Sequence, residues 1–305
     1  MSAVDRGATP PAARTSPRVR VVREARAALE LWLLPALVAS LPYRAGIALA
    51  RALCASLPLY REATEASVAQ WRRMSGSSDE HAWRAAYRFA VLVDHADLFW
   101  SLTRRSASML ARLRVPAVAL PAGPLVVVSF HYGQGLWLLH WLRSLGRPPR
   151  FVSIRLTRDD AGSTLEHAYA LLRNRQVERL SGAAPIYTGG ARAQMAATLA
   201  QGETVYGLVD VPVALHARIA NTRLFDTPAS LPTGFVEGAA AANASILVLS
   251  AYATRDGSRE VNAAVVARDA PSPLDVIASA LETCVQRAPA AWHFWHLWPA
   301  FEAAP

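Results

Sequence analysis

The sequence contains no lysine: all 32 basic residues of the 305-residue chain are arginines. Because lysine is missing from ordinary surface positions too, a GC-rich genome explains this better than a need for guanidinium chemistry. Cysteine is also scarce, since Cys54 and Cys284 are the only two and lie in separate apolar helical stretches. Their spacing fits no metal site, so they indicate a reducing compartment and nothing more.

Several well-known signatures are absent as well. The sequence has no G-x-S-x-G nucleophile elbow, no P-loop, no H-E-x-x-H and no G-x-G-x-x-G. No segment offers the roughly 20 clean apolar residues that a membrane-spanning helix requires. The most apolar one, residues 29–60, is interrupted by Pro35, Pro42, Arg44 and Arg51.

The formal net charge of +9 favours an anionic partner, such as nucleic acid, an acidic membrane surface or a phosphorylated substrate. The arginines are spread along the chain rather than arranged as a recognition helix, so we expect no nucleic-acid partner. Residues 1–28 hold six arginines and three prolines but no aromatic side chain. We therefore predict a basic, mostly disordered arm there, with an organellar transit peptide as the alternative.

Residues 29–115 are predicted to form a helical, membrane-interfacial region. Their apolar beginning carries a tryptophan and follows the basic arm, a combination typical of a helix lying in the membrane interface. A core helix of a soluble domain is the alternative. The arginine-rich flanks obey the positive-inside rule if this region lies at a cytoplasmic membrane face.

From residue 116 the pattern changes to alternating strands and helices. The predicted strands are 124–130, 150–155, 184–188, 204–210, 245–252 and 259–267. The predicted helices are 136–145, 160–180, 190–201, 234–243 and 273–287. This alternation predicts an α/β core over residues 116–305, with a mainly parallel sheet flanked by helices. The last two strands, joined by Arg255-Asp256-Gly257-Ser258, should form a hairpin.

The stretch PLVVVSFHYGQGLWLL, residues 124–139, holds the first candidate for chemistry. A valine-rich apolar run predicts a strand buried on both faces, so His131 follows the carboxyl end of a central strand. Open α/β sheets keep their ligand crevices at that edge. Gly133 and Gly135 let a substrate approach the backbone closely. The alternative is a structural histidine with satisfied hydrogen bonds.

Three later segments hold further candidates. Asp210 ends another apolar strand and should face the same edge as His131, unless it is only a loop or capping aspartate. Thr233 and Gly234 begin a helix whose free amides suit a phosphate or carboxylate, or form simply a good helix start. The aromatic tail RAPAAWHFWHLWPAF could line a pocket or anchor at a lipid interface. Its His293 and His296 lack a third ligand nearby, so we expect no metal site.

Taken in order, these pieces resemble the lipid A biosynthesis acyltransferases, the late lauroyl and myristoyl transferases of the lysophospholipid acyltransferase superfamily. The resemblance covers roughly residues 29 to 300. It begins with the broken apolar N-terminal helix and the segment His131-Tyr132-Gly133-Gln134-Gly135-Leu136. The other matching residues are Leu208, Val209, Asp210, Phe225, Pro228, Thr233, Gly234, Pro289, Trp292, Trp295 and His296.

The resemblance implies that His131 acts as a general base, but the chain departs from the family pattern at one position. Where the family has an acidic residue five positions after the histidine, this chain has Leu136. That acid would hold the histidine in the right tautomer and stabilise the imidazolium. Asp210 is the first candidate to replace it. The weaker candidates are Asp159, Asp160 and Glu166.

By the same resemblance, the expected function is transfer of a fatty acyl group from an acyl-carrier-protein or coenzyme A thioester to a hydroxyl or amine of a lipid or glycolipid. The thioester is a co-substrate, and no bound cofactor is expected. The expected substrate-binding residues are Gly133, Gly135, Arg155, Thr233 and Gly234, with His131 and Asp210 catalytic. The expected location is the cytoplasmic face of an inner membrane, peripheral or with one N-terminal anchor. A non-catalytic lipid- or acyl-chain-binding protein is the alternative.

Overall fold

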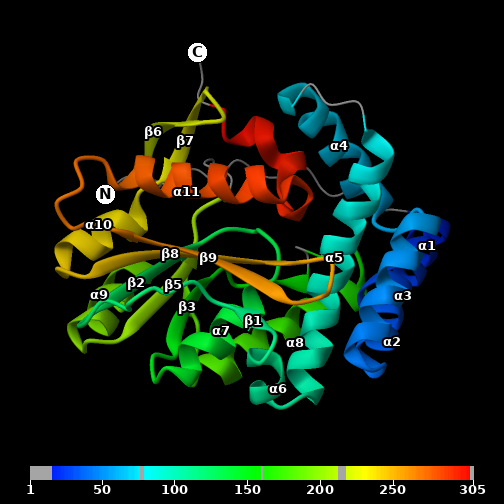
Figure 1. Ribbon diagram of the computed structural model, residues 1–305, viewed down its shortest axis with the longest axis horizontal. Coiled ribbons are helices and arrows are strands. Elements are labelled where there is room, and N and C mark those ends of the chain that lie inside the picture. Colours follow the sequence, from blue (N-terminus) through cyan, green and yellow to red (C-terminus); the bar gives the residue numbers. More distant parts are fainter. Residues whose placement is uncertain (1–15, 76–78, 159–160, 212–217, 303–305) are drawn as a thin grey trace.

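A central sheet of seven strands has the order β1-β9-β8-β2-β5-β3-β4 (Figure 1). The computed structural model describes residues 16–75, 79–158, 161–211 and 218–302. Strands β8, β2, β5, β3 and β4 run parallel, β9 is antiparallel to β8, and β1 is parallel to β9. The strands are β1 (Leu113–Arg114), β2 (Leu125–Ser129), β3 (Pro149–Ser153), β4 (Ile186–Tyr187), β5 (Thr204–Leu208), β8 (Ser245–Ala253) and β9 (Arg259–Val266). The predicted α/β fold with a mainly parallel sheet is confirmed.

Helices cover both faces of this sheet (Figure 1). One face packs against α7 and α8, and the other packs against α9, α10 and α11. These helices are α7 (Gly135–Ser144), α8 (Thr164–Ser181), α9 (Ala191–Ala200), α10 (Gly234–Ala241) and α11 (Pro273–Arg287). Strand β2 is central: Leu125 and Val127 join one hydrophobic cluster, while Val126 and Val128 join the other. The prediction from the unbroken apolar run, that this strand is buried on both faces, is therefore confirmed.

A second, two-stranded sheet was not predicted. Strands β6 (Ile219–Leu224) and β7 (Thr227–Pro232) pair as an antiparallel hairpin after β5. Phe225 and Asp226 form its two-residue turn, and both have positive φ. Asn-Gly and Asp-Gly are the usual sequences of such two-residue turns. This turn has phenylalanine at its first position, so the sequence did not predict it.

The N-terminal helices continue along the side of the core. They are α1 (Pro17–Ala27), the π-helix η1 (Ala28–Leu33), α2 (Leu34–Ser40), α3 (Tyr43–Ser56), α4 (Arg61–Ser75), α5 (Glu80–Thr103) and α6 (Ser106–Leu110). In Figure 1, α5 stands at the right-hand end of the sheet, and α1, α2 and α3 lie beyond it. Two short 3-10 helices, η4 (Pro289–Ala291) and η5 (Trp295–Ala300), follow α11.

Helix α1 corrects part of the predicted disordered arm. Residues 17–27 are helical, capped by Ser16 and begun by Pro17, whereas residues 1–15 lie outside the described residues. The helix is fixed by a long-range contact that the local sequence does not reveal. The Glu24 carboxylate accepts hydrogen bonds from the backbone N–H groups of Thr164 and Leu165, at 2.6 and 3.1 Å. These bonds lower the pKa of Glu24 and satisfy free amides at the start of α8.

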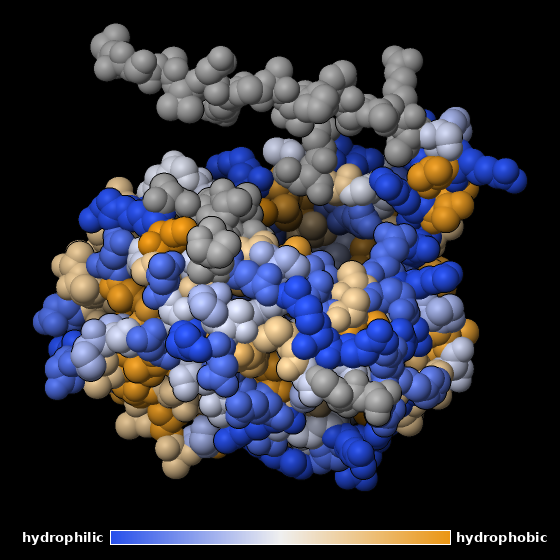
Figure 2. Space-filling model, turned by 90° about the horizontal axis from the view of Figure 1, so that it is seen from above, coloured by the Kyte–Doolittle hydropathy of each residue, from blue (hydrophilic) through white to orange (hydrophobic). Residues whose placement is uncertain are grey.

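The predicted interfacial helices bury one side and expose another. Val38, Ile47 and Ala50 pack with α5 in a hydrophobic cluster, while Leu29, Leu33 and Leu37 remain exposed. Within the described ranges, no helix is both long and apolar enough to cross a membrane. Figure 2 shows a largely hydrophilic face with separate hydrophobic patches, one of them on the right, where Figure 1 places α1.

A buried ion pair joins the N-terminal helices to the sheet. Arg259, the first residue of β9, donates to Asp97 of α5 at 2.5 Å, and both side chains are fully inaccessible to solvent. The guanidinium also lies over the Trp137 ring, 4.7 Å from its centroid. Burial raises the pKa of Asp97 to about 6, although the positive charge of Arg259 opposes this rise.

Breaking this pair from one side should be costly. Arg259→Met leaves the Asp97 carboxylate buried without its partner, so the free energy of unfolding should fall by roughly 3–5 kcal/mol. Arg114→Met is the matched control, because it breaks an exposed ion pair with Asp256 and should cost less than about 1 kcal/mol. Urea unfolding of both variants makes the comparison. Equal losses would contradict the anchoring role of Arg259.

Candidate active site

The sheet changes direction of winding between β2 and β5. These two strands are neighbours, with Ser129 paired to Leu208. The chain leaves β2 through α7 toward β3, on one side, and leaves β5 through β6, β7 and α10 toward β8, on the other. Open α/β sheets bind ligands at such a switch point, beside the carboxyl ends of the strands. His131 and Asp210 follow these two strands, so both lie there.

The structure brings His131 and Asp210 into direct contact. His131 Nδ1 lies 2.9 Å from Asp210 Oδ1, and the backbone N–H of His131 lies 2.8 Å from both carboxylate oxygens. The indole N–H of Trp292 donates to Asp210 Oδ2 at 2.9 Å. The Asp210 side chain is only 1% exposed, whereas that of His131 is 28% exposed. One buried carboxylate thus orients a histidine that solvent can reach.

This geometry assigns the tautomer of His131. A carboxylate only accepts hydrogen bonds, so Nδ1 carries the proton that it donates to Asp210. Nε2 then keeps its lone pair. None of the described residues forms a hydrogen bond with Nε2. A histidine held in this way can take a proton from an incoming hydroxyl or amine.

The aromatic tail holds the imidazole from the other side. The Phe294 ring stacks on His131 with 3.8 Å between centroids and 19° between planes. The backbone N–H of His293 donates to the carbonyl of His131 at 2.8 Å. The tail carries part of the family resemblance, but neither contact was predicted, because no local pattern reveals which ring packs on which.

Most of the tail belongs to the hydrophobic core. Four aromatic side chains of the tail are buried: Trp292, Trp295, Trp298 and Phe301. The three tryptophans pack around Phe225 of the β6–β7 turn, and Phe301 packs against Trp292. An anchor at a lipid interface, one of the readings offered for this segment, is therefore wrong for these rings. In the part of the chain that the structure describes, no group of three or more potential ligands is arranged to hold a metal ion.

A second polar layer lies behind the His131–Asp210 pair. His293 Nε2 lies 2.9 Å from the Gly133 carbonyl, so this nitrogen carries a proton. Burial lowers the pKa of His293, while the nearby negative charge of Asp94 opposes that change. Asp94 itself pairs with Arg173 at 3.0 Å. This layer was not predicted, because its residues come from three separate segments, α5, α8 and the tail.

Gly133 lies beside the site, and its missing side chain has a packing reason. Its φ is +59°, and an added Cβ would lie 2.0 Å from the carbonyl oxygen of Ala251 in β8. Gly135 is different, since it begins α7 and has room for a side chain. The nearest atom to a Cβ added there would be the Tyr206 hydroxyl oxygen, at 4.0 Å. The prediction that both glycines bind substrate remains a prediction.

The other expected substrate-binding residues are not joined to the pair by any described contact. The Thr233 hydroxyl donates to Glu237 at 2.6 Å, and Glu237 also pairs with Arg218. The Thr233 side chain makes no capping hydrogen bond to the first backbone amides of α10. A Cβ added at Gly234 would have no neighbouring atom within 4 Å. Arg155 lies over the Tyr187 ring, 4.5 Å from its centroid.

The surroundings of Leu136 show why an acid is not needed at this position. Leu136 is 2% exposed and lies in the hydrophobic cluster under the sheet, with residues of α7 and α8. An acid at residue 136 would join that cluster, and Asp210 already occupies the Nδ1 side of His131. Among the weaker candidates, Glu166 has no described contact with His131, and its backbone N–H bonds to Ser163. Asp159 and Asp160 lie outside the described residues.

The two glycines of the His131 loop offer a test of this account. Gly133→Ala should lower the free energy of unfolding by several kcal/mol, because it combines a positive φ with a backbone clash. Gly135→Ala, two residues away in a helical conformation, should be neutral or slightly stabilising. Thermal and urea unfolding would measure both. Comparable stability of the two variants would contradict the packing role of Gly133.

Comparison with known proteins adds no family assignment to this geometry. The sequence matches no protein-family model and has no significant match among curated proteins. The likeness to the lipid A acyltransferases therefore rests on the ordered motifs described above. The geometry of His131 and Asp210 stands independently of that likeness.

Proposed function

We propose that this protein is an acyltransferase in which His131 is the general base and Asp210 its orienting partner. The observation that carries the proposal is the buried Asp210 carboxylate, 2.9 Å from His131 Nδ1 at the switch point of the sheet. The acyl-transfer chemistry rests on the ordered likeness to the lipid A acyltransferases. The acid that family places five residues after the histidine is here replaced by one from the neighbouring strand.

The reaction needs one group that first accepts a proton from the acceptor and later donates it to the leaving group. His131 Nε2 takes the proton of the acceptor hydroxyl or amine while its oxygen or nitrogen attacks the thioester carbonyl carbon. The resulting tetrahedral intermediate collapses as the carbon–sulfur bond breaks. The imidazolium returns the proton to the leaving thiolate, so the products are an ester or amide and a free thiol. Asp210 stabilises the imidazolium throughout, as the third group of a hydrolytic triad does.

The donor would be a fatty acyl thioester of acyl carrier protein or coenzyme A. Both are acidic, and the net charge of +9 favours their approach. The acceptor would be a lipid or glycolipid presented at the cytoplasmic face of an inner membrane. The exposed stripe of Leu29, Leu33 and Leu37, preceded by the arginines of α1, suits the interface of an anionic membrane.

Asp210→Asn tests the catalytic pair. The amide keeps the shape but cannot hold the imidazolium or the same tautomer, so kcat should fall by about 10³–10⁴. Asp269→Asn, which changes an exposed aspartate, is the matched control and should leave kcat unchanged. The assay follows thiol release from an acyl thioester in the presence of a lysolipid or glycolipid acceptor.

His131→Gln separates an enzyme from a binding protein. The change should abolish acyl transfer while acyl-chain binding, followed with a fluorescent fatty acid, persists. If the unchanged protein binds acyl chains but transfers none to any acceptor, the protein is a lipid-binding protein on an acyltransferase fold. Transfer that survives His131→Gln would refute the mechanism.

The leucine stripe provides a separate test of the membrane surface. Replacing Leu29, Leu33 and Leu37 together by serine should weaken binding to vesicles containing anionic phospholipid by at least about tenfold, since each leucine contributes on the order of 1 kcal/mol on burial. The control replaces Leu145, Val265 and Val276, which are exposed elsewhere. Vesicle sedimentation measures both. Equal effects would mean that the stripe does not face the membrane.

A further inference from the structure

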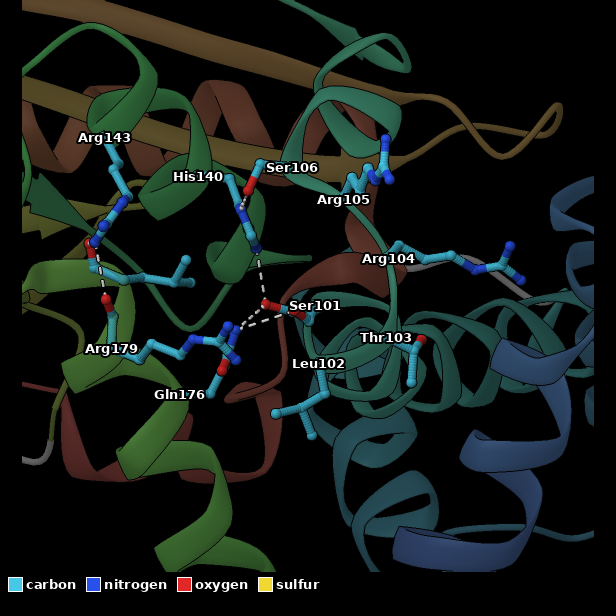
Figure 3. A pocket seen from close by; sticks show the side chains of 11 residues that line it. Ser101, Leu102, Thr103, Arg104, Arg105, Ser106, His140, Arg143, Gln176 and Arg179 are labelled. Carbon is cyan, nitrogen blue, oxygen red and sulfur yellow. Dashed lines mark hydrogen bonds between the residues drawn. The ribbon is translucent and has the colours of Figure 1, made fainter.

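An arginine-lined cavity lies away from the His131 site, where helices α5, α7 and α8 end and α6 begins (Figure 3). Its volume is about 470 Å³. Four arginines line it and no carboxylate does, so its wall carries a charge of one sign. The lining residues are Ser101, Leu102, Thr103, Arg104, Arg105, Ser106, His140, Arg143, Gln176, Arg179 and Leu180.

Two of the four guanidinium groups donate hydrogen bonds to backbone carbonyls of the protein. Arg104 donates to the carbonyls of Ala39 and Leu41, and Arg143 donates to those of Arg179 and Leu180 at the end of α8. Arg105 and Arg179 have no side-chain hydrogen bond or ion pair with any of the described residues. Figure 3 shows the Arg179 side chain pointing toward Ser101, whereas the Arg104 side chain points away.

The floor of the cavity is a buried chain of hydrogen bonds. Gln176 donates to Ser101 Oγ at 2.7 Å, Ser101 Oγ lies 2.8 Å from His140 Nε2, and His140 Nδ1 lies 2.9 Å from Ser106 Oγ. Ser101, His140 and Gln176 are each at least 95% buried. Ser101 Oγ accepts from Gln176, so its own proton is available to His140 Nε2. The other imidazole nitrogen then donates to Ser106, and the Ser106 proton is left for a ligand.

The electrostatics of the cavity agree with this arrangement. Burial, together with the positive charges of Arg143 and Arg179, lowers the pKa of His140 to about 4. The imidazole is therefore neutral at physiological pH, and the positive potential comes from the guanidinium groups. An anion bound among the guanidinium groups would reduce the repulsion between them and would accept hydrogen bonds from the donors that have no partner among the described residues.

We propose that this cavity binds a phosphate group, held by Arg179 and by the Ser106 hydroxyl. A phosphate dianion offers several acceptor oxygens at once, so it can accept from a guanidinium and a hydroxyl group that belong to different helices. The cavity is larger than phosphate alone, so the group would be part of a phosphomonoester. This site involves no residue of the His131–Asp210 pair, and it stands whether or not the acyl-transfer proposal does.

Binding of inorganic phosphate tests the proposal directly. Isothermal titration of the full-length protein at about 0.15 M ionic strength, with chloride as the competing anion, should give saturable binding at one site. Arg179→Gln should weaken it by at least about tenfold. Arg175→Gln, a change of the same charge at an exposed position on the same helix, should change the affinity less than twofold. His131→Gln should leave phosphate binding intact.

Two further arms identify the source of the phosphate. Glycerol phosphate, a soluble monoester, and vesicles containing phosphatidic acid should each compete with inorganic phosphate if their headgroup reaches the cavity; competition by only one of them assigns the natural ligand to that class. No saturable binding, or equal weakening by Arg175→Gln and Arg179→Gln, would overturn the proposal.

Discussion

The Asp210 carboxylate is the group on which the centre of this protein depends. Burying a charge is expensive unless donors surround it, and here the donors come from two distant parts of the chain. His131 supplies its backbone N–H and its imidazole from the end of β2, and Trp292 supplies its indole N–H from the tail. The strand ends, the histidine and the aromatic tail are thereby fixed relative to one another by a single side chain.

Two buried aspartates in this fold have opposite roles. Asp97 meets Arg259 where neither side chain is exposed, so the pair connects α5 to β9 and can offer nothing to a ligand. Asp210 is equally buried, but its partner His131 is partly exposed, and its Nε2 has no hydrogen-bond partner among the described residues. The difference lies in the partner: a shielded guanidinium stabilises, while an accessible imidazole can exchange protons with a substrate.

Much of the core could be predicted because its signals are local. Apolar runs and helix starts revealed the alternation of strands and helices, and the rule that parallel strands share one carboxyl edge placed Asp210 beside His131. Other features depend on tertiary contacts. Glu24 of α1 binds the first amides of α8, and the backbone of Ala251 leaves room only for a glycine at residue 133. The β6–β7 hairpin turns at a phenylalanine that no turn rule selects.

The contact between Trp292 and Asp210 spans 82 residues of sequence. A ribosome makes the chain from its N-terminus, and domains fold as their segments emerge. His131 and Asp210 can meet before Trp292 exists, but the carboxylate is then open to water, and the ring that stacks on the histidine is missing. The His131–Asp210 site thus takes its final form late in synthesis, after the sheet that supports it has been made.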